Sequence, residues 1–186
     1  MSLELFYGDW RRYNELVVRA LRPMPAAELA LTATPTHEAS STHWPIWAIA
    51  GHTAGTRVFW LCDVMGLPGA ETTPFTDAAN TGWEDDLAHS RSGEELAAAW
   101  QSTWALVERA LGQWEPAQLD EVVERHRGDG RIDRFTRRSL LLRMITHDAY
   151  HVGEIALIQG IHGRPEIDLW PSGWHTIDAE AGGEPA

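Results

Sequence analysis

Two histidines near the C-terminal end of the chain have the spacing that most directly indicates chemistry. His147 and His151 stand at positions i and i+4 of "RRSLLLRMITHDAYHVGEIALIQGIHG", a segment with helical periodicity. Side chains at this spacing project from one helix face. The other residues of that face are apolar: Leu140, Met144, Ile155 and Ile158. We therefore expect both imidazoles to point into the helix packing, where unsatisfied ring nitrogens are costly.

A third histidine, His52, lies in "WPIWAIAGHTAGTRVFW", which is also helical in spacing, and it shares a face with apolar or small residues. Three imidazoles converging from two antiparallel helices would offer a divalent metal nitrogen ligands at about 2.0–2.1 Å. Three protein ligands leave a coordination position for water or substrate, as catalytic sites do. The same spacing is compatible with hydrogen-bonded core histidines, and both interpretations stay open on spacing alone.

Glu154 is the candidate catalytic residue. It follows His151 by three positions and returns nearly to the face of His147. There it could accept a hydrogen bond from a ligating imidazole, accept a proton from bound water, or act as a fourth ligand. The alternative is a carboxylate paired with an arginine on the helix surface.

Asp148, turned about 100° from His147, is expected to meet solvent or the third helix. Arg57 is expected to be a surface or interhelix charge.

The elements that must position these side chains are mainly helices. Helical spacing predicts four of them, over about residues 3–21, 44–65, 92–114 and 137–160. Ser92 and Glu95 form a capping-box pattern at the start of the third. The stretch "EVVERHRGDGRIDRFT" contains a turn signal and could pair as a small hairpin between the third and fourth helices. We predict an all-α, up-down four-helix bundle with long connections, as a single domain over residues 1–176 with a disordered tail over 177–186.

Composition limits the classes of partner. The chain has 186 residues, with 15 Lys and Arg against 27 Asp and Glu, a formal net charge of −12. Such a surface repels phosphate backbones, so no nucleic-acid partner is expected. No apolar run is long enough to span a bilayer, and the N-terminus does not read as a signal peptide.

Cys62 is the single cysteine, which excludes an internal disulfide, and we expect it to be buried and inert. We expect a soluble, cytoplasmic protein acting on a small molecule.

The chain resembles the DinB-like family, damage-inducible proteins regarded as metalloenzymes that include thiol-dependent transferases and isomerases. The resemblance covers about residues 3–174. It rests on "WRRYNELVVRAL" in the first helix, "GHTAGTRVFW" in the second, "THDAYHVGEIALIQ" in the fourth and "GRPEIDLWPSG" after it.

The resemblance implies a DinB-like four-helix bundle with one metal ion held by a histidine of the second helix and two of the last. Residue by residue, these are His52, His147 and His151. It further implies zinc or nickel, with iron or manganese as alternatives, a low-molecular-weight thiol cosubstrate such as mycothiol or bacillithiol, and a homodimer.

Three functions are consistent with these patterns. The first is a metal-dependent enzyme that performs thiol-dependent S-transfer or isomerisation, or hydrolysis, of a small molecule. The second is a metal- or ligand-binding stress-response bundle without turnover. The third is a structural bundle whose histidines are hydrogen-bonded core residues.

Overall fold

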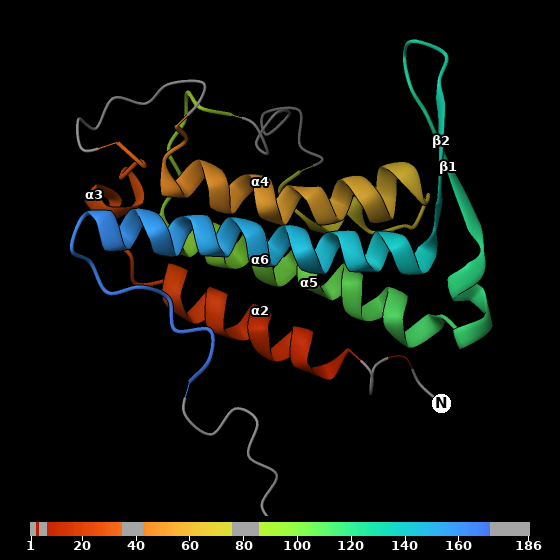
Figure 1. Ribbon diagram of the computed structural model, residues 1–186, viewed down its shortest axis with the longest axis horizontal. Helices are drawn as coiled ribbons and strands as arrows, with labels where there is room; N and C mark the ends of the chain where they lie inside the picture. The colour runs from red at the N-terminus through yellow and green to blue at the C-terminus, as the bar shows by residue number, and fades with distance from the viewer. Residues whose placement is uncertain (1–2, 4–6, 35–42, 76–85, 172–186) are drawn as a thin grey trace, which may run out of the picture.

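The computed structural model describes residues 3, 7–34, 43–75 and 86–171, and this part of the chain is mostly helical (Figure 1). Four long helices lie alongside one another: α2 (Gly8–Leu21), α4 (Ile46–Val58), α5 (Gly93–Gln113) and α6 (Arg137–Ile161). A π-helix, η1 (Phe59–Val64), continues α4 without a break. The four predicted helices are thereby confirmed, whereas the predicted tail over 177–186 lies outside the described residues.

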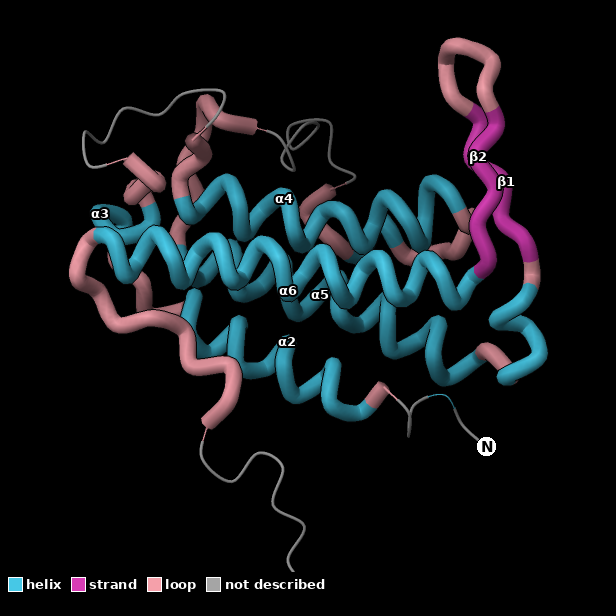
Figure 2. Tube along the Cα trace, in the orientation of Figure 1, coloured by secondary structure: helices cyan, strands magenta, loops and turns pink. Residues whose placement is uncertain are grey.

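A small antiparallel sheet stands at one end of the long helices (Figure 2). Strands β1 (Val122–His126) and β2 (Ile132–Thr136) pair along their whole length, and the turn between them holds the predicted Gly-Asp-Gly signal. The possible hairpin is therefore present, and the fold is mostly helical rather than purely all-α. Short elements complete it: α3 (Ala26–Leu29), η2 (Ala70–Thr72) and η4 (Pro116–Asp120).

The long helices do not alternate strictly in direction. The indole Nε1 of Trp100, early in α5, donates to the carbonyl of Ala50, early in α4. Arg109, late in α5, donates to the carbonyl of Pro68, just beyond η1. Helices α4 and α5 are therefore parallel to each other and antiparallel to α2 and α6, and the expected up-down order is wrong for this pair. The long connection over 65–92 makes this possible, because it returns the chain to the end where α4 began.

Local signals in the sequence fix the helix starts. The Ser92 hydroxyl accepts from the backbone N–H of Glu95, and the Glu95 carboxylate accepts from the backbone N–H of Ser92, which completes the predicted capping box. At the start of α6 the Thr136 hydroxyl accepts from the backbone N–H of Ser139. Helix α6 begins directly at the end of β2, so the hairpin and α6 are joined without a loop.

The buried face of α6 is rotated about the helix axis by roughly 45°, about half a residue step, from the expected one. Leu140, Met144, Ile155 and Ile158 are buried as predicted. The face also contains buried residues that the predicted stripe omitted: Leu141, Asp148, Val152 and Gln159. His147 and His151 are half-buried and lie at the border of this face, beside α4. The histidines are therefore partly accessible instead of fully enclosed.

Gly93 gives a test of how closely α2 approaches α5. A Cβ atom at this position would collide with the backbone carbonyl of Leu21 and lie 2.8 Å from that of Arg22. We expect Gly93→Ala to lower the free energy of unfolding by about 1–3 kcal/mol, although alanine favours helices, because backbone atoms cannot yield. Gly112→Ala in the same helix is the matched control, since its Cβ meets nothing within 4 Å. Urea unfolding followed by circular dichroism measures both, and equal stabilities would contradict this packing.

Candidate metal centre

His52 from α4 and His147 and His151 from α6 converge as predicted. Each offers one ring nitrogen, and these three atoms lie within 4.8 Å of one another. The Nε2 atoms of His52 and His147 are 3.2 Å apart. Two nitrogens on one tetrahedral ion at about 2.0–2.1 Å would be about 3.3 Å apart, so the observed spacing fits a shared metal. In the described part of the chain, this is the group of three that could hold a metal ion.

Burial keeps the central imidazole neutral. Burial is the largest cause, and together with the imidazoles of His151 and His52 and the guanidinium groups of Arg143 and Arg57 it lowers the pKa of His147 to about 3. A neutral imidazole is the form that binds metals. The Nδ1 atom of His147 is buried without a hydrogen-bond partner among the described residues. This side chain therefore meets the electrostatic requirement of a ligand, and a hydrogen bond between its Nε2 atom and His52 satisfies only one of its two ring nitrogens.

Glu154 contacts the histidine three residues before it. Its Oε2 atom lies 2.9 Å from Nδ1 of His151, within hydrogen-bonding distance. A carboxylate that accepts from Nδ1 fixes the tautomer of the ring and leaves Nε2 with its lone pair free to bind a metal. Of the roles considered for Glu154, orientation of a ligating imidazole is the one that this contact supports.

Two aromatic rings border the three imidazoles. Trp44 meets His52 edge to face with ring centroids 5.3 Å apart, and Tyr150 meets His151 in the same way at 5.0 Å. Trp44 is half-buried, whereas Tyr150 is 72% exposed. Arg143, one helical turn before His147, is exposed and places its guanidinium 5.0 Å from the ring centroid of Trp60. The surroundings of the site thus combine aromatic side chains with the cationic group of Arg143 and the carboxylate of Glu154.

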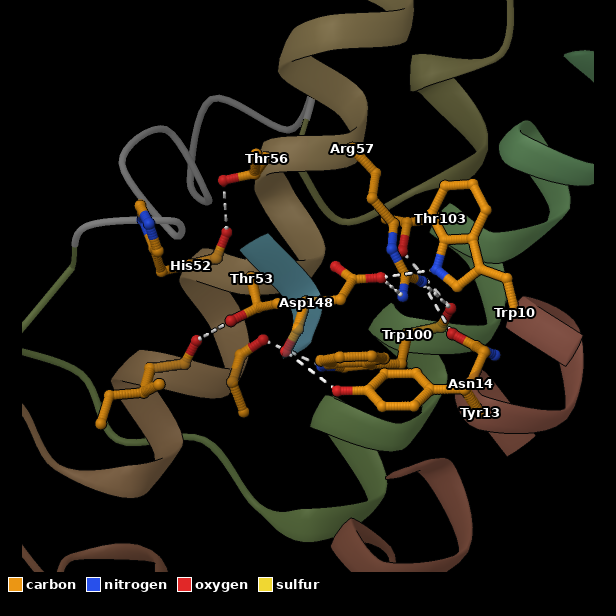
Figure 3. A network of polar contacts seen from close by, with 12 residues as sticks. Trp10, Tyr13, Asn14, His52, Thr53, Thr56, Arg57, Trp100, Thr103 and Asp148 are labelled. Atoms are coloured by element: carbon orange, nitrogen blue, oxygen red, sulfur yellow. Dashed lines mark hydrogen bonds and ion pairs between the residues drawn. The ribbon is translucent and has the colours of Figure 1, made fainter. Parts of the chain in front are cut away.

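A buried ion pair lies beside the histidines and was not anticipated. Nη2 of Arg57 on α4 is 2.7 Å from Oδ2 of Asp148 on α6, and the two side chains are 0% and 1% exposed (Figure 3). The expectation of solvent or the third helix for Asp148 is wrong, whereas of the two positions expected for Arg57 the interhelix one is confirmed and the surface one is not. No local pattern in the chain indicates this pair, because its members are 91 positions apart.

The other two long helices also contact the pair. Trp10 of α2 donates its indole N–H to Oδ2 of Asp148 at 2.9 Å, and Arg57 donates to Oδ1 of Asn14 at 2.7 Å. Arg57 also lies over the ring of Trp100 on α5, with Cζ 4.4 Å from the centroid. Burial raises the pKa of Asp148, and Arg57 and the hydrogen bonds oppose that rise. Because arginine stays charged, a neutral Asp148 would leave that charge buried alone, so the carboxyl is ionised at neutral pH.

The remaining candidates lie apart from the three imidazoles. Cys62 is half-buried instead of buried as expected, and burial raises the pKa of its thiol. His162 donates to the carbonyl of Thr32, and His126 is exposed on the hairpin. His37 and His175 lie outside the described residues.

No helix in the described ranges combines the length and apolarity needed to cross a bilayer.

Comparisons with known proteins agree with the resemblance. The chain matches the DinB superfamily over residues 6–155. A crystal structure of a DinB-like protein from Bacillus cereus superposes with a TM-score of 0.62, covering 89% of this chain and 95% of that one at 19% sequence identity. At this identity the likeness concerns the fold alone. A comparison with curated proteins gives no match.

Removing one member of the ion pair should destabilise the protein strongly. Arg57→Met leaves the Asp148 carboxylate buried without its counter-charge, so the free energy of unfolding should fall by about 3–5 kcal/mol. Arg138→Met is the control, because the Arg138–Asp120 pair is exposed and such pairs contribute about 0–1 kcal/mol. Urea unfolding of both variants measures the difference. Similar small losses for the two would show that the buried carboxylate is not charged.

Proposed function

The chain belongs to the DinB superfamily, and we propose that it is a metal-dependent enzyme whose single divalent ion is held by His52, His147 and His151. The observation that carries the proposal is the convergence of three ring nitrogens from two antiparallel helices, two of them 3.2 Å apart. When bound, such an ion supplies a Lewis acid that lowers the pKa of a water or thiol in its remaining coordination position.

The position of the histidines supports catalysis over purely structural binding. Structural zinc sites are closed by four protein ligands, whereas three ligands leave a position for a reactant. All three imidazoles are half-buried at the border of the core, so a small molecule can approach them. Glu154, held against His151, orients that ring and is the candidate to accept a proton from a nucleophile.

The reaction we propose is thiol-dependent S-transfer or isomerisation of a small molecule, with hydrolysis as the variant that uses water alone. The aromatic edges of Trp44 and Tyr150 offer apolar contact surface to an organic substrate. The thiol must come from a cosubstrate in this scheme, because the pKa of Cys62 is raised and its thiolate is disfavoured at neutral pH. Zinc or nickel is the proposed ion, since imidazole nitrogen suits both, and iron or manganese are the alternatives.

A non-catalytic metal-binding protein is the alternative, because the same three imidazoles would serve it. The homodimer and the cytoplasmic location also remain proposals. Exposed large apolar side chains on the outer face of α6 support the homodimer: Leu142, Tyr150, Leu157 and Ile161. Such a stripe is typical of surfaces that a partner covers.

Metal content tests the ligand set. Purified, metal-replete protein should contain a near-stoichiometric divalent transition metal, and His52→Ala, His147→Ala or His151→Ala should each lose most of it, because each removes one of three ligands. His126→Ala, which changes an exposed histidine of the hairpin, should retain the metal. Elemental analysis by mass spectrometry measures all five proteins. A metal-free wild type after reconstitution would exclude both the enzyme and the metal-binding alternative.

Turnover separates the enzyme from the binding protein. We expect the metal-loaded protein to accelerate consumption of a low-molecular-weight thiol by electrophilic small molecules, and His147→Ala to abolish this. Glu154→Gln should lower kcat by about 10²–10⁴-fold if Glu154 transfers a proton, with metal content measured in parallel. Glu121→Gln, a carboxylate that pairs with Arg137, is the control and should be unaffected. Full metal loading without turnover of any thiol or of water would favour the binding protein.

A further inference from the structure

The buried ion pair and the proposed metal ligands occupy the same segments of the same two helices. Asp148 directly follows His147 on α6, and Arg57 comes five residues after His52 on α4. Neighbouring residues of a helix differ by about 100° in direction and 1.5 Å in height. Figure 3 shows His52 and Arg57 leaving α4 in different directions, with Arg57 turned toward Asp148. The ion pair therefore joins α4 to α6 close to the level at which the histidines meet.

Stability alone does not explain this pair. Withdrawing two charges from water is costly, and well-packed apolar residues in place of a buried ion pair are often neutral or stabilising. The pair is also incompletely satisfied, since Nε of Arg57 and Oδ1 of Asp148 are buried without hydrogen-bond partners among the described residues. An ion pair is nevertheless directional, whereas apolar contacts are not. Its hydrogen bond forms only when the two helices have a particular separation and rotation relative to each other.

The surrounding contacts hold that geometry from two further sides. On α2, Trp10 donates to the same oxygen of Asp148 that Arg57 contacts, and Asn14 accepts from Arg57. On α5, the carbonyl and ring of Trp100 contact the guanidinium. A rotation or slide of α4 against α6 would break several of these hydrogen bonds at once. It would also change the 3.2 Å spacing between the Nε2 atoms of His52 and His147.

We propose that the Arg57–Asp148 pair is a positioning device for the metal site, which fixes the rotation and separation of α4 and α6 so that the three ring nitrogens meet before the ion binds. This inference rests on the metal site proposed above. The two residues do not contact the ion themselves, and they act through the helices that carry His52, His147 and His151. Ligands held in place in this way bind more tightly because binding need not order them.

The double substitution Arg57→Met with Asp148→Leu separates positioning from stability. It replaces both charges by apolar side chains of similar length and leaves only the neutral groups of Trp10 and Asn14 without partners, so the metal-free protein should lose less stability in urea than Arg57→Met does. Cobalt(II) affinity, measured by competition with a chromophoric chelator, should nevertheless fall about 10–100-fold. The visible absorption spectrum of the cobalt(II) protein, which reports ligand geometry, should change. An affinity within twofold of wild type with an unchanged spectrum would overturn the proposal.

Two further variants complete the experiment. Leu111→Ala removes a buried side chain at the far end of α5, so it should lower stability and leave cobalt(II) affinity and spectrum unchanged. If the double variant does not fold, Asp148→Asn keeps the shape of the side chain and removes its charge. A tenfold or greater loss of affinity in Asp148→Asn then supports the proposal, and a wild-type affinity overturns it. Absence of cobalt(II) binding by the wild type would instead refute the metal site, and positioning with it.

Discussion

The ion pair between Arg57 and Asp148 is the constraint on which the arrangement of the long helices depends. Helices α2, α4, α5 and α6 each supply a side chain or carbonyl to it. Hydrophobic burial drives these helices together, but it is non-directional and does not by itself select one pair of facing atoms. A fully buried charge pair tolerates no such freedom, because a displaced partner leaves the other charge without compensation. The packing is therefore set by a polar contact at its centre.

The rotation of α6 that brings Asp148 to the centre also decides the character of the histidine site. With Asp148 and Val152 facing inward, His147 and His151 lie at the seam between α6 and α4, where one side of each ring meets the core. Burial lowers the pKa of His147 and keeps it neutral, and both rings are only partly buried. A fully enclosed trio would bind a metal but exclude a substrate. At three fully exposed histidines, protons would compete with the metal ion for the ring nitrogens near neutral pH.

The sequence predicted the long helices, the capping box of α5 and the hairpin because each depends on neighbouring residues. The pairing of His147 with His151 was predicted because they share one helix, whereas spacing alone left the role of His52 open and the resemblance to the DinB-like family assigned it to the same site. The rotation of α6 was not predictable, because apolar residues surround that helix: Leu141 and Val152 are buried, yet Leu142 and Leu157 are exposed. The pairing of Arg57 with Asp148 was missed because the two residues lie 91 positions apart. The parallel course of α4 and α5 depends on where the 65–92 connection leads, which periodicity does not show.

That parallel course has a consequence for how the chain folds. Consecutive helices joined by short loops can pair as soon as both exist, but α4 packs against α6, and their key contacts join residues 91 and 95 positions apart. Closing so long a loop is entropically unfavourable until the intervening α5 has docked. During synthesis from the N-terminus, Arg57 therefore cannot form its ion pair with Asp148 until the last helix has left the ribosome. The final quarter of the chain completes the core, and truncation there would remove contacts from each of the preceding long helices.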